Sequence, residues 1–133
     1  MIRVGFIGLG RIADLHQLGY VGNPDAQLCA VCDTNSKTVE ARKNEWGVPK
    51  AYTDHAELLA DPDIDAVEII APQTVHEPIV LDAVRAGKHI AVQKPMTTSL
   101  DSANRMLEAV STSDRVYKVT DNYLTYPPII RLR

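Results

Sequence analysis

Long apolar runs are missing from this sequence, and their absence excludes a chain built to cross a membrane. No stretch approaches the roughly 20 consecutive apolar residues that a bilayer-spanning helix needs. A basic segment followed by an apolar one and a cleavage site is also missing behind Met1, so no secretory signal is predicted. A cytoplasmic location is therefore the default expectation.

An excess of charge of either sign is missing as well. The 133 residues contain 14 Lys and Arg against 17 Asp and Glu, which gives a formal net charge of -3. This balance argues against nucleic acid or an anionic membrane as the main partner. Internal repeats, low-complexity segments and linkers are absent up to about residue 120. One domain over residues 1–120, without a metal site, is predicted.

Cysteine is scarce, and the two that occur, Cys29 and Cys32, form a C-x-x-C pattern. A redox pair at the start of a helix is one interpretation of that pattern. The surrounding residues, QLCAVCD, have the composition of a strand, and residues three apart on a regular strand point to opposite faces. We therefore predict two small core residues whose thiols do not meet.

Short segments rich in Val, Ile and Ala alternate with helix-like segments along the chain. Strands are predicted at residues 2–7, 27–32, 50–52, 65–71, 89–92 and 116–119. Helices are predicted at residues 10–21, 36–46, 54–59, 75–86 and 99–110, with Ser36, Asp54 and Ser99 as N-caps. Apolar strands separated by helices form right-handed βαβ units. The predicted fold is α/β, with a doubly wound parallel sheet of order 3-2-1-4-5-6.

The segment GLGRIA, residues 8–13, follows the first strand and opens the first helix. This is the G-x-G-x-x-A pattern of a dinucleotide-binding turn, and a glycine-containing corner without a ligand is the alternative. Gly8 permits a tight turn, and Gly10 lets the backbone approach a pyrophosphate. The start of the helix offers unpaired N–H groups and a partial positive charge to phosphates. We expect the cofactor to contact Gly8, Gly10, Arg11, Ile12 and Ala13.

Asp33 supplies the second part of the dinucleotide pattern. It ends the second strand 23 residues after Gly10, where a carboxylate can accept hydrogen bonds from ribose hydroxyls. Asp33 would repel a 2′-phosphate, and residues 34–36 contain no arginine to receive one. Lys37 lies close enough to receive a 2′-phosphate, so NADP(H) is not excluded. NAD(H) is therefore the expected cofactor, with NADP(H) as the alternative.

Two further stretches carry a resemblance to a known family: residues 71–76 (APQTVH) and residues 87–95 (GKHIAVQKP). Together with the glycine turn and residues 65–67, they resemble the N-terminal domain of the glucose–fructose oxidoreductase, inositol dehydrogenase and MocA family. The resemblance implies a Rossmann domain joined to a C-terminal α/β domain with a large open sheet. It also implies NAD(P)-dependent oxidation or reduction of a carbohydrate-like hydroxyl or carbonyl.

The same resemblance assigns roles to residues after the fourth and fifth strands. Pro72 and His76 match a Pro-Asn-x-x-His segment that lies beside the nicotinamide half of the cofactor, although Gln73 replaces the Asn. Lys94 and Pro95 match a Glu-Lys-Pro motif whose lysine faces nicotinamide and substrate. Lys94 is thus the candidate catalytic residue and a cofactor contact. A partly exposed polar His76 and a merely solvated Lys94 are the alternatives.

Gln93 departs from the Glu-Lys-Pro motif because it replaces the glutamate with an uncharged amide. A carboxylate beside Lys94 would favour the ammonium form, and an amide does so less. Farther along, Tyr123 and Pro127 resemble the segment, here residues 121–133, that crosses to a second domain. The remaining histidines have no catalytic constellation around them and are predicted to be structural or surface residues: His16, His55 and His89.

Hydride exchange with an alcohol needs a group that moves the hydroxyl proton. In relatives that group is commonly a histidine of the C-terminal domain, which is not among these 133 residues. The expectation is a cofactor-binding part that is not catalytically complete alone and meets a small polyol or sugar only with a second domain. A non-catalytic dinucleotide sensor and a regulatory subunit are the alternatives, and a homo-oligomer fits all three. Whether the chain is a fragment, a truncated product or a subunit completed by another chain stays open.

Overall fold

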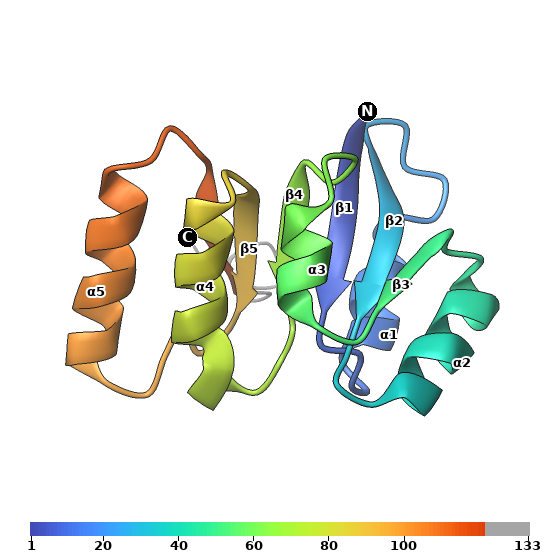
Figure 1. The fold of residues 1–133 in the computed structure, drawn as a ribbon, viewed down its shortest axis with the longest axis horizontal. Coiled ribbons are helices and arrows are strands. Elements are labelled where there is room, and N and C mark those ends of the chain that lie inside the picture. The colour runs from blue at the N-terminus through green and yellow to red at the C-terminus, as the bar shows by residue number, and fades with distance from the viewer. Residues whose placement is uncertain (122–133) are drawn as a thin grey trace, which may run out of the picture.

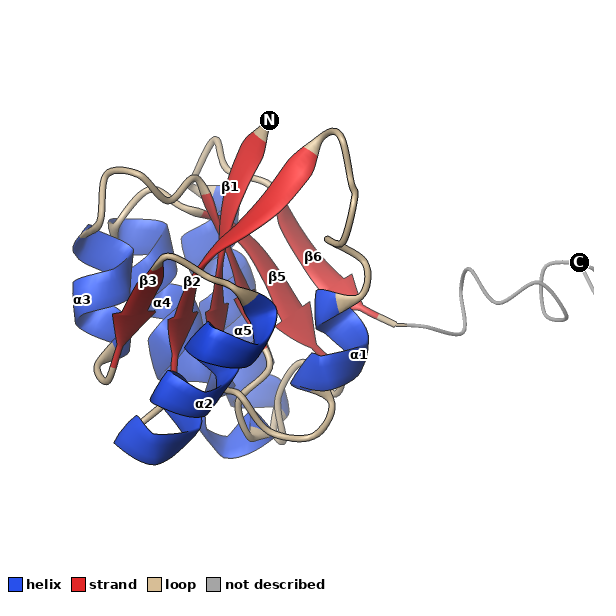
Figure 2. Ribbon diagram, turned by 90° about the vertical axis from the view of Figure 1, so that its right-hand side faces the viewer, coloured by secondary structure: helices blue, strands red, loops and turns tan. Residues whose placement is uncertain are grey.

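The computed structural model describes residues 1–121, which form a six-stranded sheet with helices on both faces (Figures 1 and 2). The strands are β1 (Ile2–Ile7), β2 (Ala26–Cys32), β3 (Lys50–Tyr52), β4 (Ala66–Ile69), β5 (His89–Gln93) and β6 (Tyr117–Thr120). The helices are α1 (Ala13–Gln17), α2 (Ser36–Trp46), α3 (His55–Ala60), α4 (His76–Arg85) and α5 (Leu100–Ser111), with a 3₁₀ turn η1 (Gln73–Val75) before α4.

The strand order is β3-β2-β1-β4-β5-β6, and the neighbouring strands pair in parallel. This confirms the predicted doubly wound topology. Helices α3, α4 and α5 cover one face of the sheet, and α1 and α2 lie on the other (Figure 1). The connections change direction between β1 and β4, so the loops leaving these two strands diverge at the carboxyl edge. Open α/β sheets bind ligands at such a point.

Two apolar cores hold the layers together, one on each face of the sheet. The core beneath α3, α4 and α5 includes the fully buried Leu58, Val80 and Met106. The core beneath α1 and α2 is built around Phe6, whose ring meets Tyr20 and Trp46 edge-on at centroid distances of 5.4 and 6.2 Å. Strands apolar on both faces are thereby buried on both faces, as expected of a parallel sheet.

The extent of the first helix and the N-cap of the second differ from the sequence prediction. Helix α1 covers Ala13–Gln17 only, because the glycine turn extends through Ile12 and the chain leaves the helix at Leu18. Gly22, at φ +68°, belongs to the turn that follows. Asn35, not Ser36, caps α2, since its side chain accepts hydrogen bonds from the N–H groups of Lys37 and Thr38. Both residue types are good N-caps, so the sequence pattern does not separate adjacent candidates.

Cys29 and Cys32 are not paired, as predicted, but the predicted reason, that they point to opposite faces of the sheet, is wrong. A bulge in the β1–β2 ladder pairs Val4 with Leu28 but Gly5 with Ala30, which skips Cys29. The bulge shifts the alternation of side chains, so Cys29 and Cys32 both pack against the α3–α5 core. Both thiols are free. Burial raises the pKa of Cys32 to about 12 and also raises that of Cys29, which disfavours the thiolate that redox chemistry needs.

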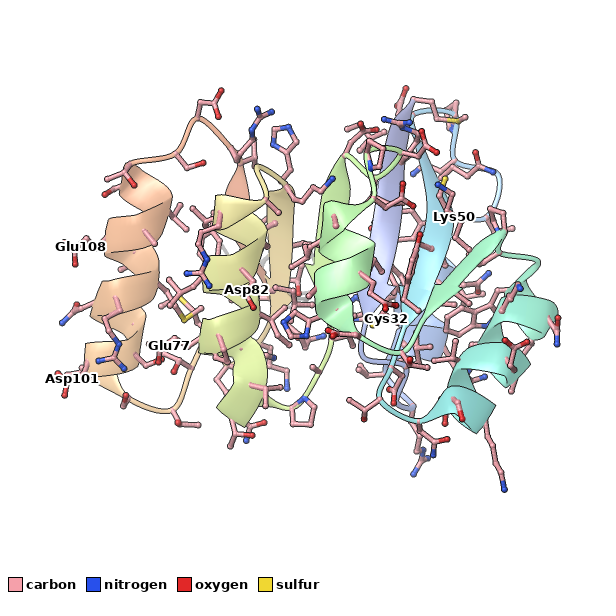
Figure 3. The ribbon with its side chains drawn as sticks, viewed as in Figure 1. Cys32, Lys50, Glu77, Asp82, Asp101 and Glu108 are labelled. Carbon is pink, nitrogen blue, oxygen red and sulfur yellow. The ribbon has the colours of Figure 1, made fainter. Side chains whose placement is uncertain are left out.

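A polar network closes the amino edge of the sheet, far from the loops that diverge at the switch point. Lys50, labelled on β3 in Figure 3, donates to both carboxylate oxygens of Asp61 at 3.0 and 2.7 Å and to Asp63 at 2.7 Å. The hydroxyl of Tyr52 donates to Asp61 as well. The hydrogen bond from Lys50, helped by Tyr52, lowers the pKa of Asp61 to about 2, although burial acts in the opposite direction.

Because of this network, we expect the free energy of unfolding to depend on pH. A carboxyl whose folded-state pKa is lowered stabilises the fold above its ordinary value of 3.8, and that contribution is lost as pH falls toward 2. We expect Asp61→Asn to lower the free energy of unfolding by about 1–3 kcal/mol near neutral pH, and by less at about pH 2. Urea unfolding at both pH values measures the difference. Asp63→Asn is the matched control: its side chain is 62% exposed, so water screens its ion pairs and we expect a clearly smaller loss than in Asp61→Asn. Equal losses in the two variants would contradict the prediction.

Within residues 1–121, no helix is both long and apolar enough to cross a membrane. The same residues contain no cluster of His, Cys, Asp or Glu suited to a metal ion. Tyr123 and Pro127, assigned above to a crossing segment, lie outside the described residues, and the boundary at residue 120 stays a prediction.

Candidate dinucleotide-binding site

The turn after β1 needs a glycine at position 8 for two separate reasons. Gly8 has φ +96°, a conformation that residues with a Cβ rarely adopt. A Cβ at this position would also lie 2.5 Å from the backbone nitrogen of Ala71 and 2.7 Å from its Cα. The end of β1 therefore packs directly on the backbone that follows β4, which closes the switch point tightly.

Gly10 has a different environment, and its neighbours offer free donors. A Cβ built on Gly10 would meet nothing within 4 Å, so the space beside the turn is open. The N–H of Ala13 already bonds to the carbonyl of Gly10, at 2.9 Å. Within residues 1–121, no acceptor takes the N–H groups of Gly10, Arg11 or Ile12. Free N–H groups at a glycine turn of this kind are donors that a phosphate can take, so these three N–H groups are candidate phosphate contacts.

Ala13 begins α1 and is completely buried in the α1–α2 core. Its small side chain lets the helix lie close on the sheet, as the glycine pattern predicts. Arg11 and Ile12 are exposed, so their contribution to the turn comes from the backbone and their side chains face solvent.

Asp33 follows β2 and holds the glycine turn in place. One carboxylate oxygen accepts the N–H of Leu9 at 2.9 Å, and the other accepts the N–H of Asn35 at 2.9 Å. An ionised carboxylate has about four lone-pair sites, so acceptor capacity remains for ribose hydroxyls. The same side chain thus fixes the turn and presents negative charge beside it.

A cleft of about 600 Å³ opens at the carboxyl edge of the sheet, beside Gly8 and Asp33. Its polar lining includes Asp33, Thr34, Thr53, His55 and Thr74, and its apolar lining includes Ile7, Pro72, Val75 and Ile79. Of these residues, Asp33 and Pro72 were predicted from the sequence as cofactor contacts, whereas the threonines and His55 were not. Thr53 directly follows β3 and Thr34 lies two residues beyond the end of β2, so a search for polar residues after each predicted strand would have found them.

His76 is buried, with 1% of its surface exposed, which overturns the alternative of a partly exposed polar residue. Its Nε2 lies 2.8 Å from the carbonyl oxygen of Ala71, and its Nδ1 lies 3.1 Å from the carbonyl oxygens of Pro95 and Met96. A neutral ring donates from one nitrogen and a protonated ring from both. Either way, His76 links the loop after β4 to the loop after β5.

Lys94 leaves the carboxyl end of β5 with an exposed side chain, and no acceptor in the described part of the chain takes its ammonium. Gln93 is buried and contacts Lys94 through the backbone: the amide oxygen accepts the Lys94 N–H at 2.7 Å. The Glu-Lys-Pro motif predicts an effect of this position on the ammonium. The structure places the Gln93 side chain instead against His16, at 2.7 Å.

The arrangement fits a nicotinamide dinucleotide in three respects. The turn carries free N–H groups beside the open space at Gly10, Asp33 contacts the same turn through the N–H of Leu9, and the cleft lies where the strand order reverses. Proteins with this sheet and turn are dinucleotide-binding proteins of the Rossmann class.

Comparison with known proteins gives the family. The model of the oxidoreductase family with an NAD-binding Rossmann fold, GFO/IDH/MocA, matches residues 2–121, and the chain belongs to this family. Myo-inositol 2-dehydrogenase of Thermotoga maritima is 35% identical over 113 residues, which cover 85% of this chain and 34% of that protein. The chain therefore spans about a third of the length of this relative.

Solved structures agree with the sequence comparison. An NAD-binding oxidoreductase from Klebsiella pneumoniae superposes with a TM-score of 0.90 at 28% identity, over 98% of this chain and 37% of that one. A levoglucosan dehydrogenase solved with NADH and L-sorbose superposes with a TM-score of 0.90 at 26% identity, over 96% of this chain and 36% of that one. The fold and the resemblance inferred from the sequence are confirmed.

Proposed function

We propose that this chain binds NAD(H) as the cofactor domain of an oxidoreductase acting on a hydroxyl or carbonyl of a sugar- or cyclitol-like substrate. The observation that carries the proposal is the set of free N–H groups on Gly10, Arg11 and Ile12, next to the carboxylate of Asp33. Relatives named for inositol and levoglucosan support the substrate class.

In the proposed complex, the turn donates its backbone N–H groups to the pyrophosphate, and Asp33 accepts from the adenosine ribose. The bound nicotinamide supplies the hydride acceptor or donor. Lys94 follows the neighbouring strand and is the group of this chain that can donate to the substrate oxygen or help move its proton. His76 supports that role by joining the loops after β4 and β5. We expect its effect to come from holding these loops, since its ring is enclosed.

The test of this proposal is cofactor selectivity, measured by calorimetric titration with NADH and NADPH. We expect the unmodified chain to bind NADH more tightly, because Asp33 faces the position of a 2′-phosphate. Asp33→Asn keeps the shape and one oxygen acceptor but removes the charge. We expect it to reduce the ratio of the NADPH to the NADH dissociation constant by roughly ten- to a hundredfold. Asp25→Asn, the same charge change at the amino edge of β2, is the control and should leave the ratio unchanged.

Tighter binding of NADPH by the unmodified chain would contradict the assignment of Asp33. A chain that binds NADH but exchanges no hydride with any polyol, even when a second domain is supplied, would favour the dinucleotide sensor or regulatory subunit. The cytoplasmic location and self-association stay predictions from the sequence.

A further inference from the structure

A continuous chain of polar side chains runs beneath α1, on the face of the sheet opposite α4. Glu68 on β4 is 5% exposed, and its Oε1 lies 2.6 Å from Nδ1 of His16. Its Oε2 accepts the hydroxyl of Tyr20 at 2.9 Å. The other ring nitrogen of His16, Nε2, lies 2.7 Å from the amide nitrogen of Gln93. This series of hydrogen bonds ends where the amide oxygen of Gln93 accepts the N–H of Lys94.

The donors in this chain can be assigned one after another. The Lys94 N–H can only donate, so the Gln93 oxygen faces Lys94 and its NH₂ group faces His16. Nε2 of His16 must then accept, and the ring proton resides on Nδ1, where it donates to Glu68. Burial, followed by the neighbouring carboxylate of Glu68, raises the pKa of Tyr20, so its hydroxyl remains a donor to Glu68.

These hydrogen bonds connect two parts of the site that are distant in sequence. His16 lies on α1, four residues beyond the free N–H of Ile12, while Lys94 follows β5. Buried and fully satisfied polar networks are rigid, because each unpaired group would carry a desolvation cost. We propose that His16 and Gln93 are positioning residues that fix the Lys94 backbone relative to the phosphate-binding turn. The importance of Lys94 rests on the proposed function, but the contact itself does not.

While the His16 ring carries a single proton, this arrangement requires glutamine and not glutamate at position 93. An ionised glutamate can accept the Lys94 N–H, but it has no proton to donate to Nε2 of His16. Two bare acceptors at 2.7 Å would repel, so Gln93→Glu would require a second proton on the ring. The ring would then lie between Glu68 and the new carboxylate as an imidazolium.

The first test is the tautomer of His16 in the unmodified chain, read from ¹⁵N NMR of the imidazole nitrogens without cofactor or substrate. We expect a protonated Nδ1 and a bare Nε2 near neutral pH. In Gln93→Glu we expect both nitrogens to be protonated, and the Lys94 amide to stay protected because an oxygen still accepts it. A protonated Nε2 in the unmodified chain, or a bare one in Gln93→Glu, would overturn the assignment.

The second test is hydrogen exchange at the Lys94 amide, compared with the Val92 amide of the same strand. His16→Ala removes the partner of Gln93, and we expect Lys94 to exchange about tenfold faster relative to Val92. Leu15→Ala, at a 64% exposed neighbour on α1, should leave the ratio unchanged. A general loss of stability would accelerate both amides together, and an unchanged ratio in His16→Ala would overturn the positioning role. If His16→Ala does not fold, the tautomer measurement still decides. Because no cofactor is present, failure here is distinguishable from failure of the proposed function.

Discussion

Gly10→Val is expected to weaken NADH binding by at least about a hundredfold while leaving the fold intact. The Cβ position is open to solvent, and Gly10 does not have positive φ, so valine costs the folded chain little. The branched side chain would occupy the space in which a pyrophosphate reaches the turn. Each charge-assisted hydrogen bond to a phosphate is worth about 1.5–3 kcal/mol, and two or more would be lost.

Calorimetric titration with NADH measures the loss, and thermal unfolding of the same variant verifies the fold. Gly10→Ala is the graded control, because its single methyl group fills less of the space and should weaken binding less. Normal NADH binding by Gly10→Val would show that the phosphates lie elsewhere.

Gly8→Ala, in contrast to Gly10→Val, is expected to destabilise the fold itself. The new methyl group would lie 2.5–2.8 Å from three backbone atoms of Ile70 and Ala71, and backbone cannot move aside as a flexible side chain can. The positive φ adds a strain of roughly 1–2 kcal/mol, and overpacking typically adds about 1–3 kcal/mol. We expect Tm to fall by roughly 10 °C or more.

Thermal unfolding monitored by circular dichroism tests this loss, with Gly10→Ala as the matched glycine control two residues away. A Tm for Gly8→Ala within about 2 °C of the unmodified value would show that the ends of β1 and β4 do not pack as closely as the structure has them. The two variants therefore test separately that Gly8 is needed for the fold and that Gly10 is needed for NADH binding.

The local sequence determined much of this protein. The alternation of apolar strands with capped helices predicts the sheet order, and the strand bounds of β1 and β3 agree with the structure residue for residue. The places of the glycine turn after β1 and of Asp33 after β2 were predictable because they depend on backbone freedom and on the ends of strands. Those are properties of short segments, and short segments are what a sequence displays.

Three features were decided only by the tertiary structure. The bulge at Cys29 is a property of the pairing between β1 and β2, so no inspection of β2 alone reveals that the two cysteines share a face. The partners of His16 are not visible in the local sequence because they lie 52 and 77 residues away, on β4 and β5. The free N–H groups of the turn depend on where α1 begins. Register, long-range hydrogen bonds and helix ends arise when separate segments pack, and the free energy that selects them is absent from each segment taken alone.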